Sequence, residues 1–285
     1  MPICALCKSD ARLQESHIIP HFVFERIKSN SPTGYLRGGL VDVNLRKQDG
    51  DKCELLCRDC EQRFSPAERE FRERVFTPYH ESGTTFCEYG PWLAYFISSV
   101  NWRTLHLDNI GFHEDKHSDE TLIILDGAER TLADFLLQRR SDISEMESHI
   151  VPMFEATHSA SPLKEPNFYF RASAFGYTFL VPSIGAFYVC ANLAGVLIFT
   201  VIHRGKDDLW ENTKVELSGG VIKGPQRIES PLIAHMIQLL ADSAKVRVSP
   251  AQRDKIIEAF RANPEAPKAK AVELRRLDSR IQDCQ

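Results

Sequence analysis

Cys4-Ala5-Leu6-Cys7 and Cys57-Arg58-Asp59-Cys60 are the two stretches around which the first eighty residues are organised. A CxxC pair places two sulfur atoms on one tight turn, and two such pairs supply the four thiolates of a closed tetrahedral zinc site. Redox-active dithiols or plain buried cysteines are the alternative interpretation, which the matched pairing disfavours. Cys53 is a fifth thiol close to the second pair and leaves the ligand count open. We therefore expect a structural Zn²⁺ ion at Cys4, Cys7, Cys57 and Cys60.

The two pairs enclose a short motif and are followed by an acidic residue. Glu15-Ser16-His17-Ile18-Ile19-Pro20 lies between them, and Glu61 follows the last cysteine directly. The order of the parts resembles the HNH (ββα-metal) nucleases that carry a structural zinc: CxxC, a polar residue with His-Ile-x-Pro, Leu-Leu-Cys-x-x-Cys and a further polar residue. The resemblance covers residues 2–75, about a quarter of the chain. It implies a zinc-bound ββα-metal module at the N-terminus.

The resemblance also implies a reaction. His17 would end the first strand of a hairpin and act as the general base that activates water. Glu61 would lie on the helix after the second strand and bind a Mg²⁺ or Mn²⁺ ion, which stabilises the charge that develops on phosphate. Glu15 and Ser16 would be weaker candidate ligands. The implied activity is that of an endonuclease that hydrolyses phosphodiester bonds of nucleic acid, with DNA as the expected substrate.

Two positions depart from the pattern of that family. The residue before the histidine is normally Asp or His, and here it is Ser16, with Glu15 one position earlier. Since strand side chains alternate between faces, Glu15 and His17 can share a face while Ser16 points away. The middle Asn of the family would fall near Lys52, and Asn44 lies too early. A catalytically inactive zinc-binding module that binds nucleic acid or protein is therefore the alternative function.

Composition allows a substantial folded core but gives no global nucleic-acid signature. The chain has 285 residues, of which 43% are hydrophobic and 26% charged, and its net charge is −4. Residues 1–80 hold 13 Lys and Arg against 12 Asp and Glu, a net charge of +1. A nuclease would therefore need a local basic face. The candidates for that face are Arg37, Arg46, Lys47, Lys52, Arg58 and Arg63, although solvated surface charges are the simpler interpretation of each.

Two features of the sequence bear on where the protein is located: its first residues and one long run without charged residues. Met1 leads directly into the first CxxC pair without a signal peptide, which favours a reducing cytoplasm. Residues 172–202 include no charged residue, and an apolar run of about twenty residues is long enough for a membrane-spanning helix. Pro182, Asn192 and several glycines interrupt this run, and its aromatic and β-branched residues favour buried strands. We expect strands there and no membrane attachment.

Local signals place several elements in the N-terminal part. Residues 17–28 read as a turn into a short helix, in which His21 is interpreted as a structural histidine. Asp49-Gly50 is a hairpin turn signal, which places residues 52–56 on the strand that enters the third cysteine. Ser65, Pro66 and Glu68 have the pattern of a capping box and predict a helix that begins at Ser65. An apolar helix over residues 91–107 is expected to pack on the N-terminal module.

These patterns predict an α+β protein of two parts. A small zinc-stapled, HNH-like module occupies residues 1–80, and a connection over 76–90 marks the domain boundary. A mixed α+β domain with a mainly antiparallel sheet follows over 91–262, with helices expected at 129–140, 230–240 and 250–260. Residues 263–285 read as a linker-like tail that ends in a short charged helix. No family is recognised after residue 90, so the role of that part, in substrate recognition, signal sensing, or contact with a protein partner or a second copy, stays open.

Two further patterns in the second part could indicate a functional site: a repeated motif and a group of histidines. Glu147-Ser148-His149-Ile150-Val151-Pro152-Met153-Phe154 repeats the motif at residues 15–22 in six of eight positions, but no CxxC pair flanks it. Coincidence is the favoured interpretation over a decayed duplication. The histidines His106, His113 and His117 fit no clear metal-ligand spacing, and histidines are common in loops, so a second metal site there is disfavoured. By analogy with free-standing nucleases, a role in defence against phage is the expected biological context.

Overall fold

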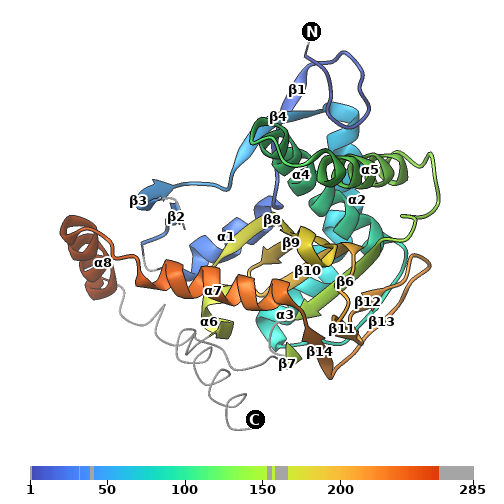
Figure 1. Cartoon of the computed structure of the whole chain (residues 1–285). Helices are drawn as coiled ribbons and strands as arrows, with labels where there is room; N and C mark the ends of the chain where they lie inside the picture. The colour runs from blue at the N-terminus through green and yellow to red at the C-terminus, as the bar shows by residue number, and fades with distance from the viewer. Residues whose placement is uncertain (1, 32, 39–41, 153–155, 158–165, 263–285) are drawn as a thin grey trace.

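The computed structural model describes residues 2–31, 33–38, 42–152, 156–157 and 166–262, and Figure 1 shows the arrangement of their elements. The protein is a mixed α+β structure in which most strand pairs are antiparallel, as the sequence predicts. The four cysteines lie together near the N-terminus. The predicted tail, residues 263–285, lies outside the described residues.

The N-terminal part is a strand pair with a helix after it. Strand β1 (Leu13–His17) pairs antiparallel with β4 (Lys52–Cys57), with Leu13 opposite Cys57 and His17 opposite Lys52. Helix α1 and the paired strands β2 and β3 lie between them in the chain. The strand predicted over residues 52–56 is confirmed as β4, but the hairpin predicted at Asp49-Gly50 is wrong, because β4 pairs with β1 instead of with β3, the strand before that bend. Pairing with β1 is what brings Cys57 to the first CxxC turn. The bounds are α1 His21–Asn30, β2 Leu36–Gly38 and β3 Asp42–Lys47.

Helix α2 (Arg58–Phe71) begins seven residues before the predicted start at Ser65. Its N-cap is Cys57, so Cys57 and Cys60 lie one turn apart on the same side, where both sulfur atoms can reach one point. This tertiary requirement outweighs the local capping-box signal, and Pro66 lies inside the helix. A π-helical turn (Arg72–Phe76) follows, and then α3 (Thr77–Ser82). The capping role predicted for Glu68 is also wrong, since Glu68 bonds to a buried arginine described below.

The second part is built on a five-stranded sheet with the order β12-β6-β10-β9-β8, in which all neighbours are antiparallel. Its strands are β6 Glu147–Pro152, β8 Ala174–Val181, β9 Ala186–Leu193, β10 Val196–His203 and β12 Lys214–Val215. Every residue of β9 is buried. Burial of this kind excludes charged side chains and explains why residues 172–202 contain none. The prediction of strands over residues 172–202 is confirmed. In the described part of the chain, no helix has the length and apolar character needed to cross a membrane.

Helices cover both faces of this sheet (Figure 1). Helix α4 (Trp92–Glu114) packs on one face, where Ile97 and Val100 meet Ile198 of β10. Helix α7 (Pro231–Lys245) covers the other face, where Leu232 and Met236 join the same cluster as Phe199. Helix α5 lies against α4, and α8 follows α7 and bonds to β3 through Gln252 and Arg46. The remaining helices are α5 Asp119–Leu136, α6 Pro166–Arg171 and α8 Pro250–Ala262.

Helix α4 also packs on the N-terminal part, which confirms the prediction for residues 91–107. Phe71 of α2 stacks on Phe96 of α4 with ring centroids 4.0 Å apart. One apolar cluster includes Val23 of α1, Phe71 of α2 and Ile198 of the sheet. Residues 76–90, the predicted boundary, hold all of α3 and strand β5 (Cys87–Tyr89), which pairs with β13 (Gly220–Ile222). A division into domains at this point stays a prediction.

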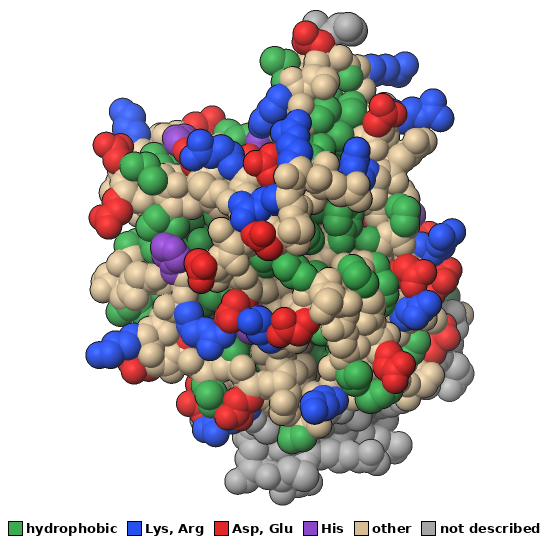
Figure 2. Space-filling model, turned by 90° about the vertical axis from the view of Figure 1, so that its right-hand side faces the viewer, with side chains coloured by type: hydrophobic (Ala, Val, Ile, Leu, Met, Phe, Trp, Pro, Cys, Tyr) green, Lys and Arg blue, Asp and Glu red, His purple; other side chains and the backbone are tan. Residues whose placement is uncertain are grey.

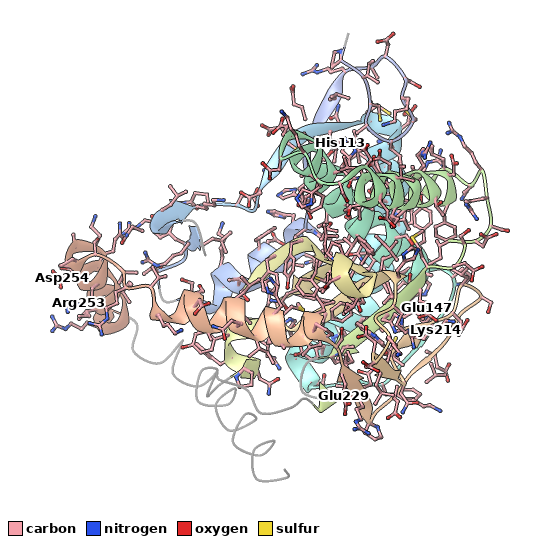
Figure 3. The ribbon with its side chains drawn as sticks, viewed as in Figure 1. His113, Glu147, Lys214, Glu229, Arg253 and Asp254 are labelled. Atoms are coloured by element: carbon pink, nitrogen blue, oxygen red, sulfur yellow. The ribbon has the colours of Figure 1, made fainter. Side chains whose placement is uncertain are left out.

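The repeated motif at residues 147–152 forms strand β6 inside the large sheet. His149 is fully buried there, and its Nδ1 lies 2.8 Å from Thr213 Oγ1. Glu147 lies 3.4 Å from Lys214 of the neighbouring strand β12, and Figure 3 labels both residues. Among the described residues, the repeated motif at 147–152 therefore does not form a second copy of the cysteine site. The other short strands are β7 Ala156–Thr157, β11 Leu209–Glu211 and β14 Gln226–Glu229.

Candidate metal centres

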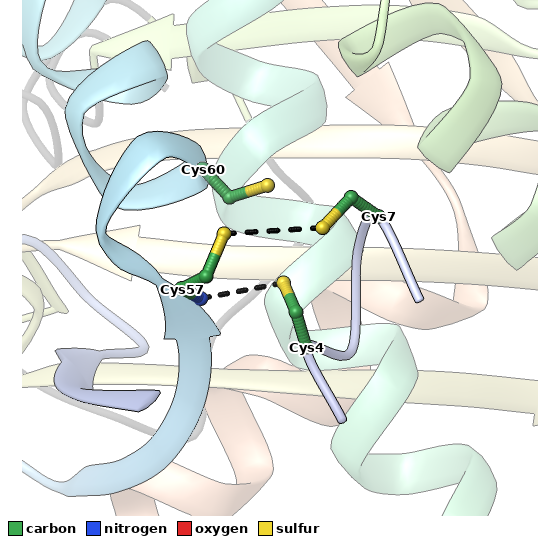
Figure 4. Close-up of side chains that lie close together, drawn as sticks. All are labelled: Cys4, Cys7, Cys57 and Cys60. Carbon is green, nitrogen blue, oxygen red and sulfur yellow. Dashed lines mark hydrogen bonds between the residues drawn. The ribbon is translucent and has the colours of Figure 1, made fainter. Parts of the chain in front are cut away.

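The four paired cysteines come together at the start of α2 (Figure 4). Their sulfur atoms all lie within 4.8 Å of one another, and Cys7 Sγ and Cys57 Sγ are 3.8 Å apart. A regular tetrahedron with Zn–S bonds of about 2.3 Å places its sulfur atoms about 3.8 Å apart. That separation is far longer than a disulfide bond of about 2.05 Å, and all four thiols are free. The four cysteines are therefore close enough to bind one metal ion.

Backbone hydrogen bonds hold the first pair in place. Lys8 N donates to Cys4 O at 2.9 Å and closes the turn, with Lys8 in the left-handed conformation at φ 62°. Ala5 N donates to Leu55 O at 3.0 Å, which fixes this turn against β4. The Cys57 N–H donates to Cys4 Sγ at 3.3 Å. This bond fixes the start of α2 beside the first CxxC turn.

The charge balance of the cluster calls for a cation. Burial by itself would raise the pKa of Cys7, but hydrogen bonds with Ser9 and with neighbouring cysteines lower that pKa to about 6. Burial and the neighbouring Cys57 and Cys4 raise the pKa of Cys60. Four thiols this close cannot all ionise unless a cation neutralises them. A divalent ion supplies that charge, so both geometry and electrostatics of the cluster suit a metal.

Cys53 stays outside this cluster, which settles the ligand count among the described residues. It lies on β4 opposite Ser16, four residues before Cys57, and is not within ligand range of the other four sulfur atoms. Its pKa is raised by burial, as for a thiol in an apolar setting. The four-cysteine set is therefore the one predicted from the two CxxC motifs.

A second group of potential metal ligands lies at the end of β1. It consists of His17, His21 and Asp49, whose ligand atoms all lie within 4.8 Å of one another. His17 Nε2 is 3.0 Å from Asp49 Oδ1, and His21 Nε2 is 3.6 Å from the same oxygen. The side chain of His17 is 19% exposed and that of His21 is 52% exposed. Solvent can therefore reach this group, unlike the cysteine cluster.

Asp49 is the functional candidate that sequence reasoning missed, because the Asp-Gly pair was interpreted only as a turn. The register of β1 and β4 places Lys52 opposite His17, so the turn just before Lys52 must lie beside that histidine. Gly50 allows the turn to close, since a Cβ there would lie 2.0 Å from a ring carbon of Phe24. The Gly50 N–H donates to Asp49 Oδ1 at 2.8 Å and orients the carboxylate. His21, interpreted as structural, joins the same group.

Lys52 and the other partners keep Asp49 ionised. Burial tends to raise the pKa of Asp49, but hydrogen bonds from Lys52, His17 and the Gly50 N–H hold it well below its usual range. Lys52 Nζ lies 2.6 Å from Asp49 Oδ2. The position expected for the family's middle Asn thus carries a cation that binds this carboxylate.

Ser16 and Glu61, two predicted site residues, meet on the side of β1 that faces α2. Ser16 Oγ donates to Glu61 Oε2 at 2.6 Å, and Ser16 is fully buried. Glu15 is exposed and lies near Lys52, whose pKa it helps to raise after the larger effect of Asp49. The structure thus joins Ser16 with Glu61 and places His17 with Asp49. No metal-ligand group of the described residues includes Glu61 or Glu15.

The side chain of Arg103 links helix α4 to the backbone of His17 and to the side chain of Glu68. The Arg103 side chain is 2% exposed. One terminal nitrogen donates to His17 O at 2.8 Å, the other to Glu68 Oε1 at 2.9 Å, and Nε donates to Ser99 O at 3.1 Å. The guanidinium lies 5.3 Å from the ring centroid of Phe64. The backbone at His17 is therefore held by a residue from the second part of the chain.

We expect the Arg103→Met variant to lose about 3 kcal/mol of unfolding free energy, because removal of one member of a buried ion pair leaves its partners without compensation. Urea unfolding with a zinc assay checks this. Arg74→Met, at an exposed pair with Glu70, is the matched control and should change the unfolding free energy by less than about 1 kcal/mol. Equal stability losses in the two variants would show that Arg103 has no special structural role.

No protein-family model, curated protein or solved structure matches this chain. The function therefore has to be inferred from the chemistry of the residues above.

The histidines that follow residue 105 form no third group of metal ligands in the described part of the chain. His106 lies in the helix predicted over residues 91–107, and His113 is also helical because α4 continues past the predicted end to Glu114. His106 Nδ1 is 2.7 Å from Glu129 and His113 Nε2 is 3.0 Å from Asp126, both on α5. These pairs join two helices side by side. Figure 3 labels His113, and Figure 2 shows one face of the protein on which positive and negative side chains are intermixed.

Proposed function

We propose that this protein is a metal-dependent endonuclease that hydrolyses phosphodiester bonds of nucleic acid, with DNA as the substrate. The observation that carries the proposal is the hydrogen bond of 3.0 Å between His17 and the ionised Asp49. A histidine oriented by a carboxylate in a solvent-accessible position is the arrangement of a general base. The order of motifs around it, which resembles the HNH nucleases, gives the reaction class.

His17 accepts a proton from water in this proposal. Because the Asp49 carboxylate is ionised, it acts only as an acceptor, and His17 Nε2–H is the donor of their bond. This tautomer leaves the lone pair of His17 Nδ1 available to take a proton from a water molecule that attacks phosphorus. The Asp49 carboxylate stabilises the imidazolium that forms. Lys52 and Gly50 hold Asp49 in position for this role.

In this proposal Glu61 is the residue that would hold a Mg²⁺ or Mn²⁺ ion, as the resemblance implies, with Ser16 as a weaker candidate. Glu61 and Ser16 present a carboxylate and a hydroxyl oxygen 2.6 Å apart, and hard oxygen ligands are what these ions prefer. Ser16 takes the place of the acidic ligand of the family, so Glu61 carries the charge, with Glu15 as a more distant candidate. When bound, such an ion stabilises negative charge on the phosphate.

The Cys4, Cys7, Cys57 and Cys60 site holds Zn²⁺ in a purely structural role. Four thiolates close the coordination sphere and leave no position for substrate. The ion fixes the start of α2 against the turn that carries Cys4, and α2 in turn carries Glu61. The distance of 3.8 Å between Cys7 Sγ and Cys57 Sγ supports this choice of metal.

Cleavage of plasmid DNA, single-stranded DNA and RNA, with and without added Mg²⁺ or Mn²⁺, tests the proposal. The divalent ion is omitted instead of chelated, because a chelator also attacks the structural zinc site. We expect DNA cleavage that requires the added ion, and for Glu61→Gln a rise of about tenfold or more in the Mg²⁺ concentration needed. Zinc content should not change.

Glu54→Gln is the control for that experiment, because Glu54 is an exposed carboxylate on β4, opposite Glu15, and belongs to no metal-ligand group of the described residues. Its Mg²⁺ dependence should match that of the wild-type protein. Identical curves for Glu61→Gln and wild type would remove Glu61 as the ligand. Absence of cleavage on every substrate and ion would favour the zinc-binding module without activity.

A further inference from the structure

We infer that His17, His21 and Asp49 form a second transition-metal site, which binds Zn²⁺ and thereby withdraws the general base from the reaction. This site is separate from the four cysteines and from Glu61. Its metal binding follows from the geometry alone, whereas its inhibitory consequence rests on the proposed function.

The distances within the group fit a small divalent ion. Asp49 Oδ1 lies 3.0 Å from His17 Nε2 and 3.6 Å from His21 Nε2. A tetrahedral ion with bonds of about 2.0–2.1 Å needs ligand atoms about 3.3 Å apart, which is the middle of that range. Small side-chain rotations are therefore enough to close the site. Two imidazoles and one carboxylate suit zinc and similar ions, and they leave a fourth position for water.

The local chain positions these ligands before any metal binds. His17 ends β1 and His21 begins α1, with Pro20 as the N-cap between them, so both rings lie on the same side of the turn. Their ring centroids are 5.1 Å apart. Asp49 comes from the turn before β4 and is oriented by the Gly50 N–H. Three separate elements thus converge on one point.

Surrounding charges support binding and limit its strength. Glu25 Oε1 lies 3.8 Å from His21 Nδ1, beyond hydrogen-bond distance, and adds a negative charge beside the site. Lys52 neutralises the other oxygen of Asp49 and disfavours a nearby cation. The affinity for Zn²⁺ should therefore be lower than that of the four-cysteine site, so the second ion binds only after the first.

Occupation of this site is incompatible with the base role of His17. A neutral imidazole that binds the ion through Nε2 carries its proton on Nδ1, so it has no lone pair left for water. The carboxylate that would stabilise the imidazolium is bound to the same ion. Zinc at this position therefore stops proton transfer without changing the fold.

Zinc binding to the full-length protein tests the site directly. Protein that holds one zinc ion per chain is titrated with Zn²⁺ by calorimetry, and a parallel titration with Co²⁺ follows the visible absorption bands. We expect one further ion per chain for the wild-type protein, and Co²⁺ bands without a thiolate charge-transfer band. His21→Ala should weaken the second binding step by at least about tenfold and leave the first ion in place.

His113→Ala is the matched control, because His113 is 50% exposed, as His21 is 52% exposed, and also lies beside one carboxylate. It should bind the second ion as the wild-type protein does. A second ion that binds equally to His21→Ala and wild type would overturn the assignment, as would a wild-type protein that binds only one ion.

Cleavage provides a separate measurement. If the protein is a nuclease, added Zn²⁺ should lower its rate in the presence of Mg²⁺, and the same addition should leave the rate of His21→Ala unchanged. Inhibition of both proteins alike would overturn the link between this site and activity. A second zinc ion in a protein without cleavage would support the site and contradict the proposed function, so the two failures are distinguishable.

Discussion

The His17→Ala variant is expected to lose DNA cleavage by a factor of about 10²–10⁴, the usual contribution of a general base. Initial rates on plasmid DNA at saturating Mg²⁺ measure this. Folding should be preserved, because the bond to Arg103 uses the backbone carbonyl of His17, which alanine retains. Asp49 also keeps Lys52 and the Gly50 N–H as partners.

The control for this variant is its zinc content and thermal unfolding, which should match those of the wild-type protein. A pH profile separates a base from a positioning residue, since loss of a base also removes the rate increase that accompanies its deprotonation. A rate for His17→Ala within twofold of wild type would contradict the proposed role.

Cys57→Ser is expected to lose the structural metal and at least about 4 kcal/mol of unfolding free energy, because loss of a metal site is among the largest effects of a single substitution. Serine is a good N-cap residue, so the start of α2 is not impaired by the change itself. Zinc content and thermal unfolding measure the effect. Chelation of the wild-type protein should produce a similar loss of stability without any substitution.

Cys53→Ser is the matched control, because Cys53 lies on the same strand and is outside the metal cluster. It should keep a full zinc content. If Cys57→Ser retained both zinc and stability, the four cysteines would not form the structural site.

Features whose signals lie in neighbouring residues were predictable in both parts of the chain. Two CxxC pairs identify four ligands by spacing alone, and the structure brings those four sulfur atoms together. The apolar, uncharged character of residues 172–202 was correctly interpreted as buried strands, because β-branched and aromatic residues pack well in a sheet with both faces covered. These features depend on residues that are neighbours in the chain.

The rest depends on contacts between distant residues, for which one sequence carries no signal. The role of Asp49 follows from the pairing of β1 with β4, two strands separated by α1, β2 and β3. The start of α2 is set by the cysteine cluster and not by the capping pattern at Ser65. No local pattern indicates the partners of Arg103, which is buried against the backbone of His17 and the side chain of Glu68. Each of these positions is set by tertiary structure.

The packing of α4 against α2 has a consequence for how such a protein can change over evolution. The stacked rings of Phe71 and Phe96 and the buried Arg103 connect the segment that carries the four cysteines to the sheet through one helix. Such a segment cannot be transferred by itself to another protein, because its apolar side would be exposed to solvent. Its sequence and that of α4 are expected to change together, one substitution compensating another.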